Sequence, residues 1–319
     1  MSKPRIFIDG HAGTTGLRIR EWLAGRDDCE IWTLDEAERK SEPARKKAIA
    51  EADLSVLCLP DAAAVEAAAW ASESGGRLID ASSSHRVAEG WVYGFPELEP
   101  GHRDRIANAQ FVSNPGCYPS IFIPLVRPLV DEGLLSKDAP LAIHGLSGYS
   151  GGGKALIEKW EAKDEGRVGL PFEAPYALDR VHKHLPEMKA YSLLTHPPQF
   201  VPAVGPFACG MRVQIPVHAS QLAAGTTGEQ VWQTLVDRYA GEPFVEVAPF
   251  QGFDPVDDFS LDPRVLNDTN KVRLHVLPNP EGHILLVGIL DNLGKGASGV
   301  AIQSLNLMLG LGETTGLPS

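Results

Sequence analysis

The chain has 319 residues, of which 43% are hydrophobic and 22% are charged, and its formal net charge is −12. This length suits two domains, and this composition is ordinary for globular proteins, so it argues against a disordered or fibrous chain. The acidic balance argues against a nucleic-acid partner, because no local basic patch opposes it.

Four short apolar runs in the first hundred residues predict strands. They are RIFID from Arg5, EIWTL from Glu30, LSVLCL from Leu54 and RLIDAS from Arg77. Helical patterns follow the first three runs, over residues 17–25, 43–51 and 61–74. Because the strands alternate with helices and read as continuous apolar runs, we predict an α/β fold whose first domain is a Rossmann-like, doubly wound parallel sheet.

The periodicity changes after residue 114, where we place a domain boundary. A helical pattern with two prolines covers residues 121–135, and a buried strand is predicted over residues 141–148. Longer strand candidates begin at Phe207, Lys271 and His283, and residues 228–241 form a helix candidate. We therefore predict a first, Rossmann-like domain over residues 1–114. We predict an α+β domain over residues 115–292 and expect it to bind substrate and to form the subunit contact.

The last segment, residues 293–319, has apolar residues at helical spacing from Ala297 onward. We expect its helix to pack back on the first domain. The long strands of the second domain need partners, so we expect a homo-oligomer, either a dimer or a tetramer.

The cysteines and apolar runs indicate the compartment. Four cysteines, at positions 29, 58, 117 and 209, form no CxxC pair and have no zinc-like Cys/His spacing, so we expect no disulfide framework and no metal. The first residues lack the pattern of a signal peptide, and no apolar run has membrane-spanning length. We expect a cytoplasmic chain with no membrane partner.

A glycine pattern, Gly10-x-x-Gly13-x-x-Gly16, lies between the first predicted strand and the first predicted helix. This is the context of a dinucleotide fingerprint, in which glycines allow close approach to a pyrophosphate at a helix N-terminus. The hydroxyls of Thr14 and Thr15 add donors. An ordinary tight turn is the alternative.

The residues after the second predicted strand give conflicting signals about the dinucleotide. Asp35 favours a free ribose 2′-hydroxyl, whereas Arg39 and Lys40 favour a 2′-phosphate. A solvated loop that contacts neither group is an equally good interpretation.

The stretch Asn114-Pro115-Gly116-Cys117-Tyr118-Pro119 places a cysteine after a turn and at the expected start of a helix. A helix N-terminus stabilises a thiolate, which is the nucleophilic form of cysteine. The other three cysteines lie beside or within apolar strand candidates, so we expect them to be buried in the core.

His182 and His184 offer two candidate proton acceptors for the cysteine. In an extended segment they share a face, and in a helix they diverge, so the sequence does not choose between them. We interpret His85, His144 and His196 as structural.

A glycine-rich stretch from Ser147 to Lys154 follows a strand candidate and precedes a helix candidate. Its backbone and its lysine suit an anionic acyl phosphate, and a mobile loop is the alternative. Ala155 follows the lysine, so the Walker spacing of nucleotide triphosphatases is not met.

Three separated motifs resemble those of the N-acetyl-gamma-glutamyl-phosphate reductase family, in its shorter branch, and the resemblance runs nearly end to end. The motifs are NPGCYPS at 114–120, HKHLPE at 182–187 and DNLGKGASGVAIQ at 291–303. The resemblance implies NADP as the cofactor, with Ser82 and Ser83 lining it beside the glycine turn. It also implies that Asn292 and Gly296 lie near the nicotinamide.

The same resemblance implies the chemistry of arginine biosynthesis. Cys117 forms a thioester with the γ-acyl group of a small acyl-phosphate substrate, NADPH reduces the thioester to the semialdehyde, and His182 moves the protons, with His184 as the other candidate. The residues expected to position substrate are Asn114, Ser147, Lys154, Tyr176 and Glu187.

One departure from the family concerns the phosphate. Where many relatives carry a basic residue before a Gly-Ile pair, this chain has Gly205-Pro206, and its first arginine afterwards is Arg212. Lys154 or Arg180 are candidate substitutes.

Three other functions are alternatives to this reductase. They are a semialdehyde dehydrogenase acting on aspartyl phosphate or on a carrier-bound aminoadipyl phosphate, a non-catalytic NADP-binding regulator, and a cysteine hydrolase.

Overall fold

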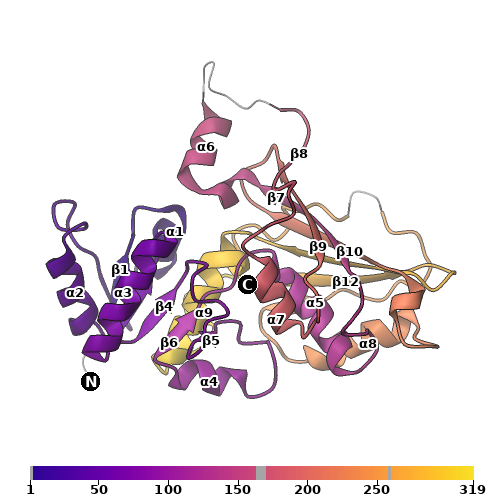
Figure 1. Cartoon of the computed structure of the whole chain (residues 1–319), viewed down its shortest axis with the longest axis horizontal. Coiled ribbons are helices and arrows are strands. Elements are labelled where there is room, and N and C mark those ends of the chain that lie inside the picture. Colours follow the sequence, from indigo (N-terminus) through magenta and orange to yellow (C-terminus); the bar gives the residue numbers. More distant parts are fainter. Residues whose placement is uncertain (1–2, 163–169, 258–259) are drawn as a thin grey trace. The chain divides into compact units, whose positions relative to one another are not determined.

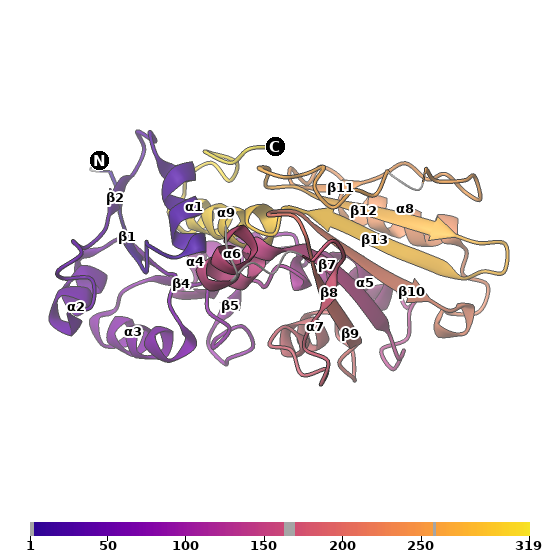
Figure 2. The same ribbon diagram turned by 90° about the horizontal axis from the view of Figure 1, so that it is seen from above.

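A computed structural model describes residues 3–162, 170–257 and 260–319, and it divides into two compact units (Figures 1 and 2). Unit 1 extends to Pro115 and includes Ala297–Pro318, whereas unit 2 is Gly116–Gly296. The functional domain limits predicted above, at residues 114 and 292, remain predictions.

Unit 1 is built on one six-stranded sheet in which every pair of neighbouring strands is parallel. The strand order is β2-β1-β3-β4-β6-β5, which confirms the predicted Rossmann-like sheet. Its elements are β1 (Arg5–Asp9), α1 (Thr14–Leu23), β2 (Glu30–Trp32), α2 (Glu42–Glu51), β3 (Leu54–Leu57), α3 (Asp61–Ser74), β4 (Leu78–Asp80), β5 (Val92–Tyr93), α4 (His102–Asn108), β6 (Phe111–Ser113) and α9 (Gly299–Met308).

The middle strands of this sheet are buried on both faces because helices cover them, which is why they read as unbroken apolar runs. Phe7, Leu57 and Leu78 join small residues of α2 and α3 in one core cluster. Helix α9 packs on α4, α1 and β4, all within unit 1. The predicted return of the C-terminal helix to the first domain is therefore confirmed.

Unit 2 contains a mixed seven-stranded sheet of order β11-β12-β13-β10-β7-β9-β8. The β7–β9 and β11–β12 pairs are parallel and the other pairs are antiparallel, as an α+β domain allows. Its elements are α5 (Pro119–Asp131), β7 (Ala142–Gly148), α6 (Gly153–Glu161), β8 (Ala174–Pro175), α7 (Leu185–Tyr191), β9 (Gln199–Gly205), β10 (Met211–Val217), α8 (Gly228–Arg238), β11 (Val245–Val247), β12 (Val272–Pro278) and β13 (Ile284–Leu290).

Helices α5 and α8 pack against one face of this sheet and bury most of the apolar core. Helix α5 lies close to the strands because two of them carry glycine where it crosses. A Cβ on Gly145 would come within 2.3 Å of the Tyr118 ring, and one on Gly288 within 2.1 Å of Ile121. The start of α5, and with it the cysteine motif, is thereby held firmly against the sheet.

Candidate active site

The turn after β1 requires glycine at two of its three pattern positions. Gly10 has φ +84°, and a Cβ there would lie 2.2 Å from the Cys58 carbonyl oxygen. A Cβ on Gly16 would lie 2.7 Å from the Gly10 carbonyl oxygen, whereas Gly13 has room, with that oxygen 3.5 Å away. The backbone therefore forms a narrow cradle that side chains would fill, as a pyrophosphate site demands.

Helix α1 starts at Thr14 directly after this cradle, and its N-cap, Gly13, has no side chain to bond the first amides. The amino end of a ten-residue helix then offers N–H groups and a partial positive charge to an anion. The geometry fits the predicted dinucleotide fingerprint.

Replacing Gly10 by alanine is expected to lower the free energy of unfolding by about 2–4 kcal/mol, because alanine is strained at positive φ and its Cβ would strike the Cys58 carbonyl. Gly13→Ala is the matched control and is expected to change it by no more than about 1 kcal/mol. Urea unfolding of both variants measures the difference. Equal destabilisation would contradict the account of the turn.

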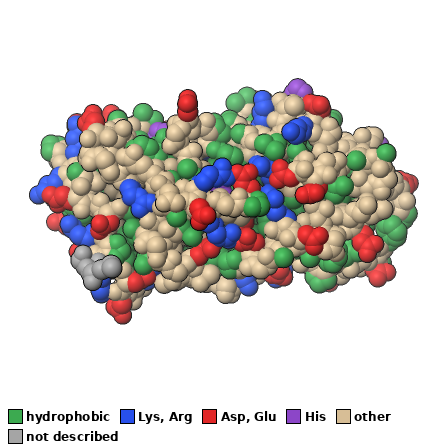
Figure 3. Space-filling model, turned by 90° about the horizontal axis from the view of Figure 1, so that it is seen from below, with side chains coloured by type: hydrophobic (Ala, Val, Ile, Leu, Met, Phe, Trp, Pro, Cys, Tyr) green, Lys and Arg blue, Asp and Glu red, His purple; other side chains and the backbone are tan. Residues whose placement is uncertain are grey.

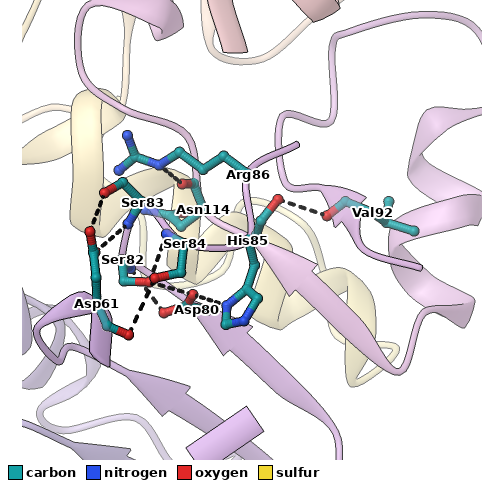
Figure 4. Close-up of polar contacts among 10 residues, drawn as sticks. Asp61, Asp80, Ser82, Ser83, Ser84, His85, Arg86, Val92 and Asn114 are labelled. Carbon is teal, nitrogen blue, oxygen red and sulfur yellow. Dashed lines mark hydrogen bonds and ion pairs between the residues drawn. The ribbon is translucent and has the colours of Figure 1, made fainter. Parts of the chain in front are cut away.

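A polar cluster occupies the carboxyl end of β4, the same edge of the sheet as the glycine turn (Figure 4). Asp80, which is fully buried, accepts from the Ser82 N–H at 2.9 Å, the Ser82 hydroxyl at 2.6 Å and His85 Nδ1 at 2.6 Å. The Ser83 N–H and hydroxyl donate to the Asp61 carboxylate at 3.0 and 2.8 Å. These bonds hold both predicted cofactor serines in a fixed loop.

Two more residues of this cluster, His85 and Arg86, contact later parts of unit 1. The His85 ring stacks on Trp91 at 4.1 Å, in keeping with its structural interpretation. Arg86, which the sequence analysis did not single out, is 7% exposed, and its Nε donates to the Asn114 carbonyl at 3.1 Å. A basic residue that follows a buried strand was the only available signal.

Cys117 lies at the amino end of α5, as predicted. Tyr118 caps the helix and Pro119 begins it, and the Gly116 carbonyl accepts from both the N–H and the hydroxyl of Ser120 at 3.0 Å. Cys117 is partly exposed and packs against the edge of the unit 2 core. A thirteen-residue helix directs its partial positive charge toward this thiol.

The other three cysteines follow the prediction of burial only in part. Cys29 is buried, as predicted. Cys58 and Cys209 are partly exposed as whole residues, but the Cys58 thiol itself is buried, so the prediction was wrong for Cys209 only. Cys58 lies just past the end of β3, and burial of its thiol still raises its pKa to about 12, which keeps it protonated. The sulfur of Cys209 lies in a bend before β10, 3.4 Å from the Ser150 hydroxyl.

The two histidines lie in a turn that is neither extended nor helical, and His184 caps α7. The His184 backbone N–H donates to His182 Nδ1 at 3.2 Å, and the two rings are 4.6 Å apart. His184 is 5% exposed, whereas His182 is partly exposed. The turn therefore brings both imidazoles together but leaves mainly His182 accessible.

Two tyrosines complete this ring cluster. The His182 ring lies 6.1 Å from the Tyr118 ring and 5.8 Å from the Tyr176 ring, and the Tyr176 hydroxyl donates to the Tyr118 hydroxyl at 3.4 Å. Burial raises the pKa of Tyr176 to about 12, and the neighbouring Cys117 thiol adds to the rise. Tyr176 therefore stays protonated, and its hydroxyl hydrogen points to the Tyr118 oxygen.

Glu187 and Gly296 contact the cysteine turn from two other segments. Glu187 is fully buried, and its Oε2 accepts from the Gly116 N–H at 3.1 Å, next to the cysteine. A Cβ on Gly296 would lie 2.9 Å from Cys117 Cβ. Both residues fix the position of Cys117, Glu187 by a hydrogen bond and Gly296 by having no side chain.

The remaining predicted residues of unit 2 lie in or beside the glycine-rich loop, and the Ser147 side chain also interacts with Tyr118. Ser147 is buried, and its hydroxyl donates to the Gly148 carbonyl at 3.1 Å. The Asn292 amide accepts from the Gly210 N–H at 2.8 Å and donates to the Ser150 hydroxyl at 2.9 Å, so both of its ends are engaged. The side chain of Lys154 is 79% exposed on α6 and lies 3.8 Å from Glu158.

Over the described ranges, no helix is long and apolar enough to cross a membrane, and no three His, Cys, Asp or Glu side chains gather as metal ligands. On the face drawn in Figure 3, the coloured basic and acidic side chains are interspersed.

Two family models match the chain. The model for the NAD binding domain of semialdehyde dehydrogenases matches residues 24–109, and the model for the semialdehyde dehydrogenase dimerisation domain matches residues 117–292. Together they cover most of both units.

Curated relatives match over almost the full length. N-acetyl-gamma-glutamyl-phosphate reductase 2 of Nostoc sp. is 49% identical, and the match covers 99% of this chain and 100% of the relative. N-acetyl-gamma-glutamyl-phosphate reductase of Burkholderia lata is 48% identical, with 98% of each chain covered.

Solved structures share the fold at low identity. Aspartate semialdehyde dehydrogenase II of Vibrio cholerae matches with a TM-score of 0.73 and 17% identity, covering 97% of this chain and 99% of that one. Aspartate semialdehyde dehydrogenase with NADP from Candida albicans matches with a TM-score of 0.64 and 16% identity, at the same coverage.

Proposed function

Because the chain belongs to the N-acetyl-gamma-glutamyl-phosphate reductase family, we propose that it reduces N-acetyl-gamma-glutamyl phosphate to N-acetylglutamate 5-semialdehyde with NADPH, a step of arginine biosynthesis. The observation that carries this function is the 49% identity to a curated reductase over 99% of this chain. A thiol at the start of α5 and a glycine cradle after β1 provide the two groups that such an oxidoreductase needs.

The NADP cofactor fits the cradle after β1, where Gly10 and Gly16 leave the backbone open and α1 presents its amino end. Gly13, Thr14, Thr15, Ser82 and Ser83 are the other residues of unit 1 that we propose to hold it. When bound, NADPH supplies the hydride that reduces the acyl group. Asn292 and Gly296 remain predictions for the nicotinamide end.

The Cys117 thiolate is the proposed nucleophile. Its sulfur attacks the γ-carbonyl carbon, a C–S bond forms, and the C–O bond to phosphate breaks, so that inorganic phosphate leaves and a thioester remains on Cys117. The amide of Tyr118 follows the nucleophile directly and has no partner in the described part of the chain, which supports it as a donor to the developing oxyanion.

After reduction the carbon holds the hydride, the sulfur and an oxyanion as a thiohemiacetal on Cys117. The C–S bond then breaks, the carbonyl forms, and the thiolate is regenerated as the semialdehyde leaves. Proton transfer to and from the oxygen during these steps needs an acid and base beside Cys117.

His182 is the proposed acid and base. Its Nδ1 accepts from the His184 N–H, so the neutral ring carries its proton on Nε2 and can donate it. The His184 backbone N–H holds this tautomer, and the His184 side chain is only 5% exposed, which argues against its meeting substrate. We therefore propose different tasks for the two histidines.

The residues expected to position substrate divide by their exposure. The Tyr176 ring lies in the cluster beside Cys117, and Lys154 is exposed at the start of α6, so both remain candidates for substrate contact. Glu187 is fully buried against Gly116, and we propose that it positions the cysteine turn. Ser147 is 4% exposed and its hydroxyl donates to the neighbouring Gly148 carbonyl, so we propose that it also stabilises the site and does not contact substrate.

Selection of NADP over NAD is proposed to depend on Arg39. Its guanidinium pairs with Glu36 at 2.7 Å and holds the pKa of Glu36 below its ordinary value, with smaller contributions from His11 and Lys40. His11 follows Gly10, so this charged loop lies close to the glycine turn, where an adenosine ribose would bind. The Arg39 guanidinium can leave the Glu36 carboxylate and form an ion pair with the 2′-phosphate of NADP instead.

Arg39→Gln is expected to weaken NADP binding about tenfold or more while leaving NAD binding unchanged, because only NADP carries the 2′-phosphate. Glu36→Gln is expected to have the opposite sign and to strengthen NADP binding, since it removes a competing carboxylate. Lys46→Gln on α2 is the control, because Lys46 pairs with Glu42 of its own helix. Calorimetric titration with both nucleotides measures this, and parallel losses for NAD and NADP would contradict it.

The chain is further proposed to act in the cytoplasm as a dimer or tetramer, with unit 2 in the subunit contact. The match to a dimerisation domain over residues 117–292 supports this. Helices α5 and α8 pack on one face of its sheet, and on the strands the exposed residues His144 and Pro216 point to the other face. All four cysteines are reduced thiols outside any disulfide, as suits a reducing compartment.

A coupled assay in the reverse direction tests the function. N-acetylglutamate semialdehyde, phosphate and NADP are expected to give NADPH, and the rate is expected to depend on phosphate. Aspartate semialdehyde in its place distinguishes the aspartyl-phosphate alternative, which the likeness to aspartate semialdehyde dehydrogenases supports at the level of fold alone. Activity with aspartate semialdehyde only would transfer the assignment to that substrate.

A further inference from the structure

The side chain of Asn114 carries a buried amide oxygen, Oδ1, that has no hydrogen-bond partner among the described residues. Asn114 follows the last residue of β6 and is 2% exposed. A buried acceptor without a donor is unfavourable, so it is stabilised when an N–H or O–H group reaches it.

The orientation of this amide is fixed by its other end. Asn114 Nδ2 donates to the Ala297 carbonyl at 2.9 Å, and because a carbonyl only accepts, the amide cannot be turned over. The Asn114 backbone N–H donates to the Asp80 carbonyl at 2.8 Å, and its carbonyl accepts from Arg86 Nε at 3.1 Å (Figure 4). Oδ1 is therefore an acceptor held in one place.

The place of Asn114 in the sheet indicates what donates to it. Strands β1, β3, β4 and β6 are successive neighbours, so Asn114 lies three strands from the glycine turn, roughly 14 Å across the carboxyl edge. A dinucleotide whose pyrophosphate binds at that turn extends across this edge, with its nicotinamide end farther from β2. The nicotinamide carries a carboxamide whose NH₂ group is a hydrogen-bond donor.

We propose that Asn114 Oδ1 accepts a hydrogen bond from the carboxamide NH₂ of the bound nicotinamide. This assignment rests on the proposed function and replaces the expectation that Asn114 binds the acyl substrate. A carboxamide held in this way limits rotation of the nicotinamide ring about its bond to the ribose. Asn114 thus contributes to which face of the ring is presented for hydride transfer.

The test compares two nucleotides by calorimetry in the absence of substrate. NADP carries the NH₂ donor, whereas its 3-acetylpyridine analogue has a methyl group in that place and no donor. Wild-type protein is expected to bind the analogue about tenfold more weakly than NADP, the size of one net hydrogen bond.

Two variants of Asn114 separate the acceptor from the rest of the side chain. In Asn114→Ala, which has no acceptor, the preference for NADP over the analogue is expected to fall to within about twofold. In Asn114→Asp, an oxygen remains as acceptor whether the carboxyl is ionised or protonated, so the preference is expected to persist. Ser113→Ala, which removes a weak 3.5 Å contact to the Val92 carbonyl, controls for changes in the packing of β6.

The outcomes are distinguishable. A preference that remains tenfold in Asn114→Ala overturns the inference, and so does a wild-type preference near one. If Asn114→Ala leaves the nucleotide preference intact but weakens binding of N-acetylglutamate semialdehyde, the oxygen serves the substrate amide instead. Failure of the wild-type protein to bind either nucleotide would count against the proposed function itself.

Discussion

Replacing Cys117 by serine is expected to lower kcat at least about a thousandfold in both directions of the reaction, because a serine hydroxyl at this site does not ionise to form the acyl intermediate. The substitution is nearly isosteric, and Cys117 is partly exposed at the edge of the core, so the free energy of unfolding should change by less than about 1 kcal/mol. The phosphate-dependent formation of NADPH measures activity, and urea unfolding measures stability.

Cys209→Ser is the matched control for this prediction. Cys209 is also a reduced thiol and partly exposed. A serine there keeps a contact to the Ser150 hydroxyl, so activity should remain close to that of the wild type. Iodoacetamide labelling gives a second readout, since Cys117 should react first. Preferential labelling of Cys209, or an active Cys117→Ser variant, would contradict the assignment of Cys117 as the nucleophile.

Replacing His182 by asparagine is expected to lower kcat about a hundredfold or more, because asparagine keeps a polar group but cannot exchange protons near neutral pH. Cofactor affinity should not change. Steady-state kinetics in both directions, together with NADP titration, separate these effects. Retention of kcat within a fewfold of the wild type would rule out His182 as the acid and base.

Two further histidine variants distinguish this role from general disruption. His196→Asn alters an exposed side chain in the loop before β9 and should leave kinetics unchanged. His184→Asn alters the buried cap of α7, so its main effect should be on the free energy of unfolding. If His184→Asn instead lowered kcat as much as His182→Asn without loss of stability, the two histidines would share the proton transfer.

Much of the fold was predictable because the signals were local. Strand β1 and helix α3 match their predicted bounds, since the first is a β-branched run before a glycine turn and the second an alanine-rich run that ends at a left-handed glycine. Strand β9 was not predicted. It contains Pro202, which weakens any strand pattern, and it forms by parallel pairing with β7, a partner far away in the sequence.

The candidate site was predictable to a similar degree. The placement of Cys117 followed from its own motif, whereas the turn at His182 and His184 depends on Pro186 in the first turn of α7 and on packing against Tyr118. The contact of Arg86 with Asn114 joins two strand ends that only the folded sheet brings together. Contacts of this kind cannot be predicted from the hydrophobic periodicity of a single sequence.

The division of the chain also has a consequence for its synthesis. Unit 1 is discontinuous, since α9 comes from the end of the chain yet packs on α1, α4 and β4, and Arg77 donates to the Met308 carbonyl at 2.6 Å. A ribosome delivers Gly116–Gly296 in full before it makes α9. Unit 2 can therefore be fully synthesised while unit 1 still lacks its last helix, α9. A chain that terminates before α9 would contain the Cys117 thiol but an incomplete unit 1.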